Sequence, residues 1–330
     1  MNDSYSDNLK ARFQKTFGSL QANALAMRSR AIVGTDALPA SPQGQLALSA
    51  LEKLRTGADP GPTPAEFAAL EYMIRAMRPS PLVHRGVIDA QTDPDFLAAF
   101  SDWPTFTAGF SQYSSSVGCL FKLAAGQPPQ GEGTGFLVAK DVALTNAHVL
   151  DALSMGVRQL QKGQAMIRFG CEAGVFDADP QIDVTGVLAV HALLDACLLS
   201  LTPDAAHGTA LALSTATAKG GQDVGAVGFP YPDPRDPAFV ASTFGNQFGF
   251  KRVSPGMVTG LQTPDPTSTG VFYHDCSTLG GNSGSPLFSL ANDVVVGLHT
   301  GGAFMWKNTA IDMAALTPWI QEQTGVGKHA

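Results

Sequence analysis

The sequence predicts a small all-α domain followed by a larger all-β domain of the antiparallel sandwich or barrel type. Apolar residues recur at helical spacing in residues 1 to about 100, whereas from Val117 onward short apolar runs alternate with clusters of Gly, Pro and Asp. Charged residues make up only 15% of the chain, which contains 35 glycines and 22 prolines. Few charges and many turn-forming residues are typical of a loop-rich β domain.

The clearest helix in the N-terminal part is the stretch TPAEFAALEYMIRAMRP. Thr63 fits the N-cap, Pro64 the first helical position, and Glu66 completes a capping box with Thr63. Pro79 ends the helix, whose apolar face consists of Phe67, Leu70, Ile74 and Met77. Two further helices are indicated by the apolar spacing of Leu9, Phe13, Phe17 and Leu20 and of Leu48, Leu51 and Leu54.

The composition changes between residues 101 and 116, where Ser, Thr and aromatic residues dominate. We therefore expect a helical domain with its linker over residues 1–110 and the β domain over residues 111–330. The 330-residue length is also typical of two domains rather than one.

The charge and the cysteines narrow the class of protein. The net charge is −7, and no stretch concentrates Lys and Arg, so we expect no nucleic-acid partner. No apolar run is long enough to span a membrane and the first residues do not resemble an export signal, so we expect a cytoplasmic location. The scattered cysteines Cys119, Cys171, Cys197 and Cys276 are expected to be buried thiols.

The heptapeptide GGNSGSP, from Gly280 to Pro286, predicts a nucleophilic serine. Its glycines allow a tight turn in which the N–H groups of Gly281 and Ser283 form an oxyanion hole for the attacked carbonyl. The alternatives are a plain glycine–serine turn and the nucleophile elbow of an α/β-hydrolase. The elbow is excluded because too few residues follow Ser283 to supply an acid and then a histidine.

A general base and its acid partner are expected upstream of the serine. His148 follows the apolar run VALTNA, where a strand end with a small neighbour can hold an imidazole in one orientation. Asp195 opens the apolar run DACLLSL, where a carboxylate is costly without a partner. Asp183 is the less favoured candidate for the acid, since it lies with Asp177 and Asp179 in a polar, proline-containing stretch.

The three local sequences, in the order His, Asp, Ser, resemble those of the chymotrypsin-like (trypsin-like) serine proteases over roughly residues 114–325. TNAHV is similar to the family's TAAH motif, DACLLSL to D-I-A-L-L-x-L, and GNSGSP to GDSGGP. The resemblance implies two six-stranded antiparallel barrels with the site in the cleft between them, and a C-terminal helix around ALTPWIQEQ. It implies that His148, Asp195 and Ser283 are catalytic, and that no metal or organic cofactor is needed.

One departure places the chain closer to the bacterial branch of that family. Asn282 stands where the animal digestive enzymes have an aspartate that pairs with a newly cut N-terminus, so that mode of activation is not expected here. STLGGNSGSP followed by GLHTGG is most similar to the glutamyl endopeptidases. That likeness implies that Thr278 and His299 bind the substrate side chain, with a preference for Glu or Asp before the cut. The competing interpretation makes His299 a wall residue of a pocket for another side chain.

The sequence therefore predicts a serine endopeptidase that acts on protein or peptide substrates through an acyl-enzyme on Ser283. The alternative is a catalytically idle protease fold that serves as a binding scaffold. The architecture resembles the effector-associated proteases of bacterial defence systems, which implies that the helical domain recruits or restrains the enzyme through a partner protein. A stabilising appendage or a removable pro-segment is the simpler alternative for the helical domain.

The other histidines show no spacing that suggests a metal site, and we assign them no role. They are His84, His191, His207, His274 and His329.

Overall fold

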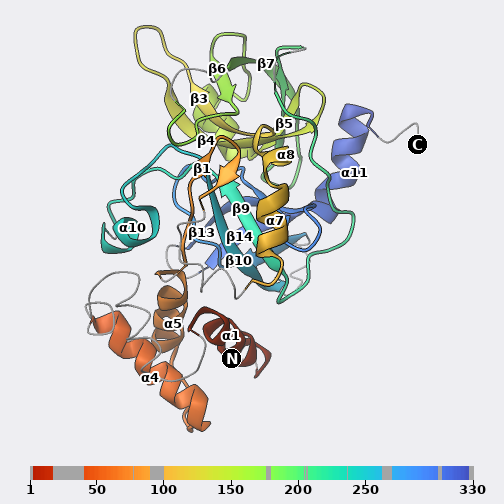
Figure 1. Cartoon of the computed structure of the whole chain (residues 1–330). Coiled ribbons are helices and arrows are strands. Elements are labelled where there is room, and N and C mark those ends of the chain that lie inside the picture. Colours follow the sequence, from red (N-terminus) through yellow and green to blue (C-terminus); the bar gives the residue numbers. More distant parts are fainter. Residues whose placement is uncertain are drawn as a thin grey trace.

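The computed structural model describes residues 3–17, 41–76, 78–89, 100–175, 180–203, 205, 207–235, 237–261, 270–303 and 307–326. In these residues, three N-terminal helices precede two closed antiparallel barrels of six strands each (Figure 1). The predicted fold class is confirmed.

The three N-terminal helices are α1 (Asp3–Phe17), α4 (Pro42–Thr56) and α5 (Pro64–Ala76). The capping box of α5 forms as predicted: the N–H of Thr63 donates to Glu66 Oε2 at 2.7 Å, and the N–H of Glu66 donates to Thr63 Oγ1 at 3.2 Å. The helices share one apolar core, which also takes in Val240, Phe244 and Leu279 from the second barrel's loops. Two residues of the expected apolar faces, Leu20 and Met77, lie outside the described residues.

The first barrel follows the strand order β3-β4-β5-β8-β7-β6. Its strands are β3 (Val117–Lys122), β4 (Gln130–Ala139), β5 (Val142–Thr145), β6 (Ala165–Arg168), β7 (Gln181–Val190) and β8 (Cys197–Leu201). A short helix, α9 (Ala147–Ser154), follows β5 directly. Closure leaves the barrel without exposed strand edges, so the ends of β5 and β8 are held firmly for the residues that follow or precede them.

The second barrel follows the order β10-β11-β14-β13-β12-β9. Its strands are β9 (Asp223–Gly228), β10 (Arg252–Leu261), β11 (Val271–His274), β12 (Pro286–Ser289), β13 (Val295–Ala303) and β14 (Lys307–Asp312). The expected C-terminal helix is α11 (Met313–Thr324), capped by the Asp312 carboxylate. A further helix, α10 (Pro237–Phe244), lies between β9 and β10. None of the described helices is long and apolar enough to cross a membrane.

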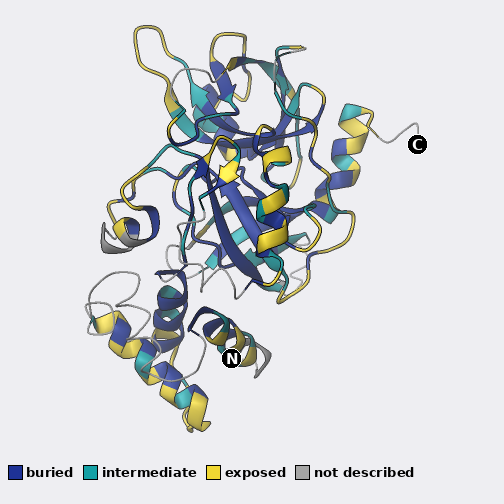
Figure 2. Ribbon diagram, viewed as in Figure 1, coloured by how far each residue is buried: buried dark blue, intermediate teal, exposed yellow. Residues whose placement is uncertain are grey.

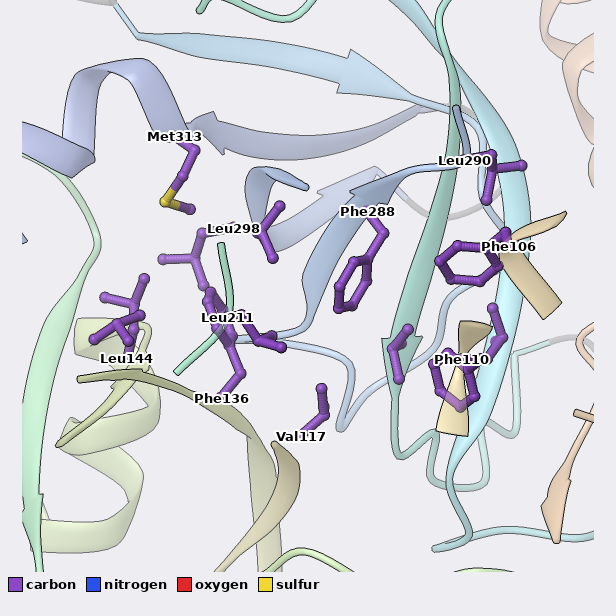
Figure 3. Close-up of a cluster of buried hydrophobic side chains, with 14 of the residues drawn as sticks. Phe106, Phe110, Val117, Phe136, Leu144, Leu211, Phe288, Leu290, Leu298 and Met313 are labelled. Atoms are coloured by element: carbon purple, nitrogen blue, oxygen red, sulfur yellow. The ribbon is translucent and has the colours of Figure 1, made fainter. Parts of the chain in front are cut away.

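A single apolar core joins the two barrels (Figure 3). Phe136 and Leu144 reach it from the first barrel, and Phe288 and Leu298 reach it from the second. Two short helices before the first barrel, α7 (Trp103–Gly109) and α8 (Ser111–Ser114), cover one side of this core, with the Phe106 ring 5.8 Å from that of Phe288. Because close packing resists displacement, the barrels hold a fixed relative position.

The N-terminal helices are fastened to the second barrel by buried charges. The Arg12 guanidinium of α1 pairs with Glu71 of α5 and, at 3.0 Å, with Asp275, which follows β11. Arg78, just after α5, pairs with the same Asp275 carboxylate. Burial raises the pKa of Asp275, but Arg78 and Arg12 lower it by more, to well below its usual range. Figure 2 shows that α5 is buried along nearly all of its length.

The chain then continues along the barrel. After Arg78 it forms a small hairpin of β1 (Val83–His84) and β2 (Val87–Ile88). The N–H of Val83 donates to the Lys251 carbonyl, and the N–H of Val253 donates to the Pro81 carbonyl, both at 3.0 Å. Through these hydrogen bonds, the segment between α5 and α7 pairs with the chain at the start of β10.

We expect Arg12→Leu to lower the free energy of unfolding by about 3–5 kcal/mol, because it breaks two buried ion pairs, one with Glu71 and one with Asp275. Urea unfolding followed by circular dichroism measures this loss. The matched control is Arg55→Leu, which removes an exposed arginine that pairs with Glu52 on α4 and should have little effect. Equal stability of the two variants would contradict the structural role given to Arg12.

Candidate active site

His148 and Asp195 meet at the mouth of the first barrel. His148 lies in the first turn of α9, directly after the strand end at which it was expected, and Asp195 lies two residues before β8. Asp195 Oδ2 accepts a hydrogen bond from His148 Nδ1 at 2.6 Å, and Oδ1 accepts one from the His148 backbone N–H at 2.9 Å. Two bonds from one carboxylate fix both the position of the residue and the orientation of its ring.

The surroundings of Asp195 keep its carboxylate ionised. Partial burial raises the pKa of Asp195, but hydrogen bonds from the ring and backbone of His148 and from the backbone of Ala147 lower it by more. The net result is a pKa below the ordinary value, so Asp195 is negatively charged when the imidazole beside it takes up a proton. The loop carrying Asp195 is held in turn by Asn146, whose Nδ2 donates to the Asp195 carbonyl at 2.9 Å.

The Ser283 loop comes from the second barrel and is bound to the first. The N–H of Thr134, on β4, donates to the Ser283 carbonyl at 2.8 Å, and Thr134 Oγ1 donates to the Gly281 carbonyl at 2.8 Å. A side chain at Gly133 would meet both Val149, next to His148, and the Ser283 carbonyl. The loop of the serine and the helix of the histidine therefore pack against the same short stretch of β4.

Two backbone N–H groups in this loop have no carbonyl partner among the described residues. The Gly280 carbonyl accepts from the N–H of Tyr231 at 2.7 Å, and the Asn282 carbonyl accepts from the N–H of Ser285 at 2.9 Å. Because carbonyl and N–H point in opposite directions across a trans peptide, the N–H groups of Gly281 and Ser283 point away from these partners. Neither donates to a carbonyl within the described residues. They are the donors that the sequence assigned to an oxyanion hole.

Gly281 is required by both its conformation and its surroundings. Its φ is 89°, in the left-handed region, and a Cβ there would lie 2.2 Å from the Phe229 carbonyl oxygen and 2.3 Å from the Tyr231 ring. Gly280, its neighbour, has no atom within 4 Å of an added Cβ. Of the two adjacent glycines, only Gly281 lacks space for a side chain.

The Ser283 hydroxyl is not hydrogen-bonded to His148 in this structure. Its Oγ donates instead to the Thr300 carbonyl at 3.4 Å, which is a long and weak contact. Hydrogen bonds between a nucleophile and its base are often long without substrate and tighten when substrate binds. A rotation of the serine side chain would break only this weak contact.

A cavity of about 180 Å³ opens beside Ser283 and is lined by Thr278 and His299. His299 is buried, and its Nδ1 lies 3.0 Å from His274 Nε2. Burial, together with the charges of His148 and Arg75, lowers the pKa of His299 to about 3. His299 is therefore neutral at physiological pH, and its Nε2 has no partner within the described residues.

The structure thus brings the predicted residues Ser283, Thr278 and His299 to one cavity, and His148 lies close enough to His299 to affect its pKa. Asp183 is placed elsewhere: it lies on β7, 3.6 Å from the Lys162 ammonium. Asp177 and Asp179 lie outside the described residues.

Sequence reasoning missed three residues of this site. His274 received no role but contacts His299, and the cavity is also lined by Arg75 and Arg235. Partly buried and buried residues alternate along β11, and His274 is at a buried position, as is the residue two positions before it. This alternation is the signal that could have placed His274 inside the barrel. Arg75 and Arg235 carried no comparable pattern.

We expect Gly281→Ala to reduce the rate at which a fluorophosphonate labels Ser283 by about 10²–10³, because the added methyl group displaces an oxyanion donor. Gly280→Ala is the matched control and should label at nearly the normal rate. Equal labelling of the two variants would exclude an oxyanion hole at this peptide.

Comparisons with known proteins give the family of the chain. The family of the trypsin-like peptidase domain matches residues 133–298. A probable serine protease of Lysobacter enzymogenes is 31% identical over 311 residues, covering 76% of this chain and 74% of that protein. Two crystal structures are similar at a TM-score of 0.46. One is a protease of M. tuberculosis in its active form, with 21% identity over 71% of this chain and 87% of that one. The other is a serine endoprotease of Yersinia pestis, with 16% identity over 67% of each chain.

By the family match and the curated relative, the chain belongs to the trypsin-like peptidase family.

Proposed function

We propose that the protein is a serine endopeptidase with His148, Asp195 and Ser283 as its catalytic residues. Ser283 Oγ attacks the carbonyl carbon of a peptide bond while His148 Nε2 takes the hydroxyl proton. The negative oxygen is stabilised by the N–H groups of Gly281 and Ser283. His148 then gives the proton to the leaving amine, and water hydrolyses the acyl-enzyme by the same route in reverse.

The observation that carries this proposal is the double hydrogen bond by which Asp195 holds His148. An ionised carboxylate on Nδ1 leaves Nε2 as the base and stabilises the imidazolium that forms. A catalytically idle scaffold would not need this hold or the unpaired N–H groups beside Ser283, and no observation favours that alternative.

We further propose that the enzyme prefers Glu or Asp before the cleaved bond. The cavity beside Ser283 presents the Thr278 hydroxyl and the His299 ring. The two buried histidines share one proton between His274 Nε2 and His299 Nδ1. If His299 donated it, His274 Nδ1–H would be buried without an acceptor, since that atom has no partner among the described residues. The other arrangement is favoured, and it makes His299 Nε2–H a donor toward a carboxylate.

The role of the N-terminal helices stays a prediction. Their buried ion pairs with Asp275 support a part in stabilising the second barrel. Recruitment or restraint by a partner protein, and a place in a bacterial defence cascade, rest on the likeness of architecture. A cytoplasmic location likewise remains an expectation.

The direct test of the proposed activity is labelling of the full chain with a fluorophosphonate probe, which reacts with activated serines. We expect labelling at Ser283, located by mass spectrometry, and its loss in Ser283→Ala. Asp195→Asn should lower the labelling rate by about 10³–10⁴, because the ring loses its orienting charge. A wild-type chain that resists the probe would refute the proposed activity.

The acid preference should not depend on pH across the working range. His299 has a depressed pKa of about 3, so it remains neutral from pH 6 to 9, and a substrate glutamate remains ionised there. We expect the ratio of kcat/KM for matched peptides with Glu or Gln before the cut to be constant over this range. Any effect of pH on the chemical step is common to both peptides and cancels in the ratio. A ratio that falls as the pH rises from 6 to 7.5 would show that an imidazolium binds the carboxylate.

A further inference from the structure

An arginine from outside the barrels reaches the cavity beside the nucleophile. Arg75 lies in the last turn of α5, yet it lines the same cavity as Ser283, Thr278 and His299. Only 4% of it is exposed. Its guanidinium has no hydrogen bond or ion pair within the described residues, and its Nε is buried without a partner. A buried polar group in this condition is rare and calls for an explanation.

The neighbouring carboxylates do not explain it, because other arginines occupy them. Arg12 pairs with both Glu71 and Asp275, and Arg78 pairs with Asp275. The described part of this cluster therefore holds three guanidinium groups, including Arg75, against two carboxylates. One positive charge is left over. Burial lowers the pKa of Arg75, partly offset by Glu71 and Asp275, but a guanidinium stays protonated in proteins.

The other arginine at the cavity differs in this respect. Arg235 also lines it, but the Asp233 carboxylate accepts hydrogen bonds from the Arg235 guanidinium and backbone. Its charge is already compensated, and most of its side chain is exposed. Among the described residues that line the cavity, the unmatched charge is therefore that of Arg75.

The backbone of Arg75 is also fixed to the cavity wall. Ser277 Oγ donates to the Arg75 carbonyl at 3.2 Å, and Ser277 directly precedes Thr278. The end of α5 and the loop after β11 that presents Thr278 therefore hold each other in position. Arg75 reaches the cavity from a supported position rather than from a loop.

We propose that Arg75 is a specificity-determining residue whose guanidinium binds the side-chain carboxylate of the substrate residue before the cleaved bond. This inference rests on the proposed function and deepens it. Thr278 and His299 supply neutral donors, and Arg75 supplies the positive charge that they lack. Helix α5, some 200 residues from the nucleophile in sequence, is then a wall of the substrate pocket rather than part of a separate module.

The test compares full-length variants on matched peptides that carry Glu or Gln before the cut. We expect Arg75→Met to lower the Glu:Gln ratio of kcat/KM by about 10- to 100-fold, the size of a lost charge-assisted interaction. The loss should lie with the Glu peptide, and Arg75→Lys should restore part of it. Arg235→Met is the comparison variant, and its ratio should change less than about threefold because Asp233 compensates that charge.

Thermal unfolding of the same variants separates binding from a structural role. Removal of an unmatched buried charge should leave the melting temperature of Arg75→Met unchanged or raised. A lowered melting temperature with an unchanged Glu:Gln ratio would make Arg75 a structural residue and overturn the proposal.

Binding without turnover keeps this inference distinguishable from the proposed activity. In the Ser283→Ala background, affinities for the Glu and Gln peptides can be measured by calorimetry with Arg75 present or replaced by Met. A preference for the Glu peptide that disappears with Arg75 supports the inference even if the wild-type chain resists the fluorophosphonate. Equal affinities with Arg75 present would overturn it even if the chain is an active protease.

Discussion

The carboxylate of Asp275 is fully buried, and the cations that keep it ionised come from outside its own barrel. Arg12 reaches it from α1 and Arg78 from the segment after α5. An unpaired carboxylate at this depth would cost several kcal/mol, so the second barrel and the N-terminal helices depend on each other. Because Ser277 and Thr278 follow within three residues, the same clamp determines where the wall of the substrate cavity lies.

The candidate site is assembled from three parts of the fold. The first barrel supplies His148 and Asp195, the second supplies the Ser283 loop, and α5 supplies Arg75 to the lining of the cavity. Thr134 joins the first two through its bonds to the Ser283 and Gly281 carbonyls, and Ser277 joins the second to α5. Each joint is a hydrogen bond to backbone, which fixes position without consuming the side-chain groups that act on substrate.

The sequence was informative wherever chemistry depends on a short local pattern. The capping box at Thr63 and the positions of His148 and Ser283 could be predicted because neighbouring residues limit the backbone at those sites. Arg75 could not. It stands four residues after Glu71, a spacing typical of an exposed ion pair on a helix surface. Only the tertiary structure shows that both are buried and that Arg12 has taken the carboxylate. Pairings between distant segments leave no trace in local spacing.

The distance along the chain between the partners of the Asp275 clamp has a consequence for biosynthesis. Arg12 is synthesised early, and Asp275, one of its two carboxylate partners, follows 263 positions later. At typical rates of translation, α1 waits on the order of tens of seconds for that partner. The N-terminal helices cannot complete their packing during this interval, and neither can the pocket they border. A nascent chain therefore contains His148 and Asp195 well before Ser283 and the cavity beside it are complete.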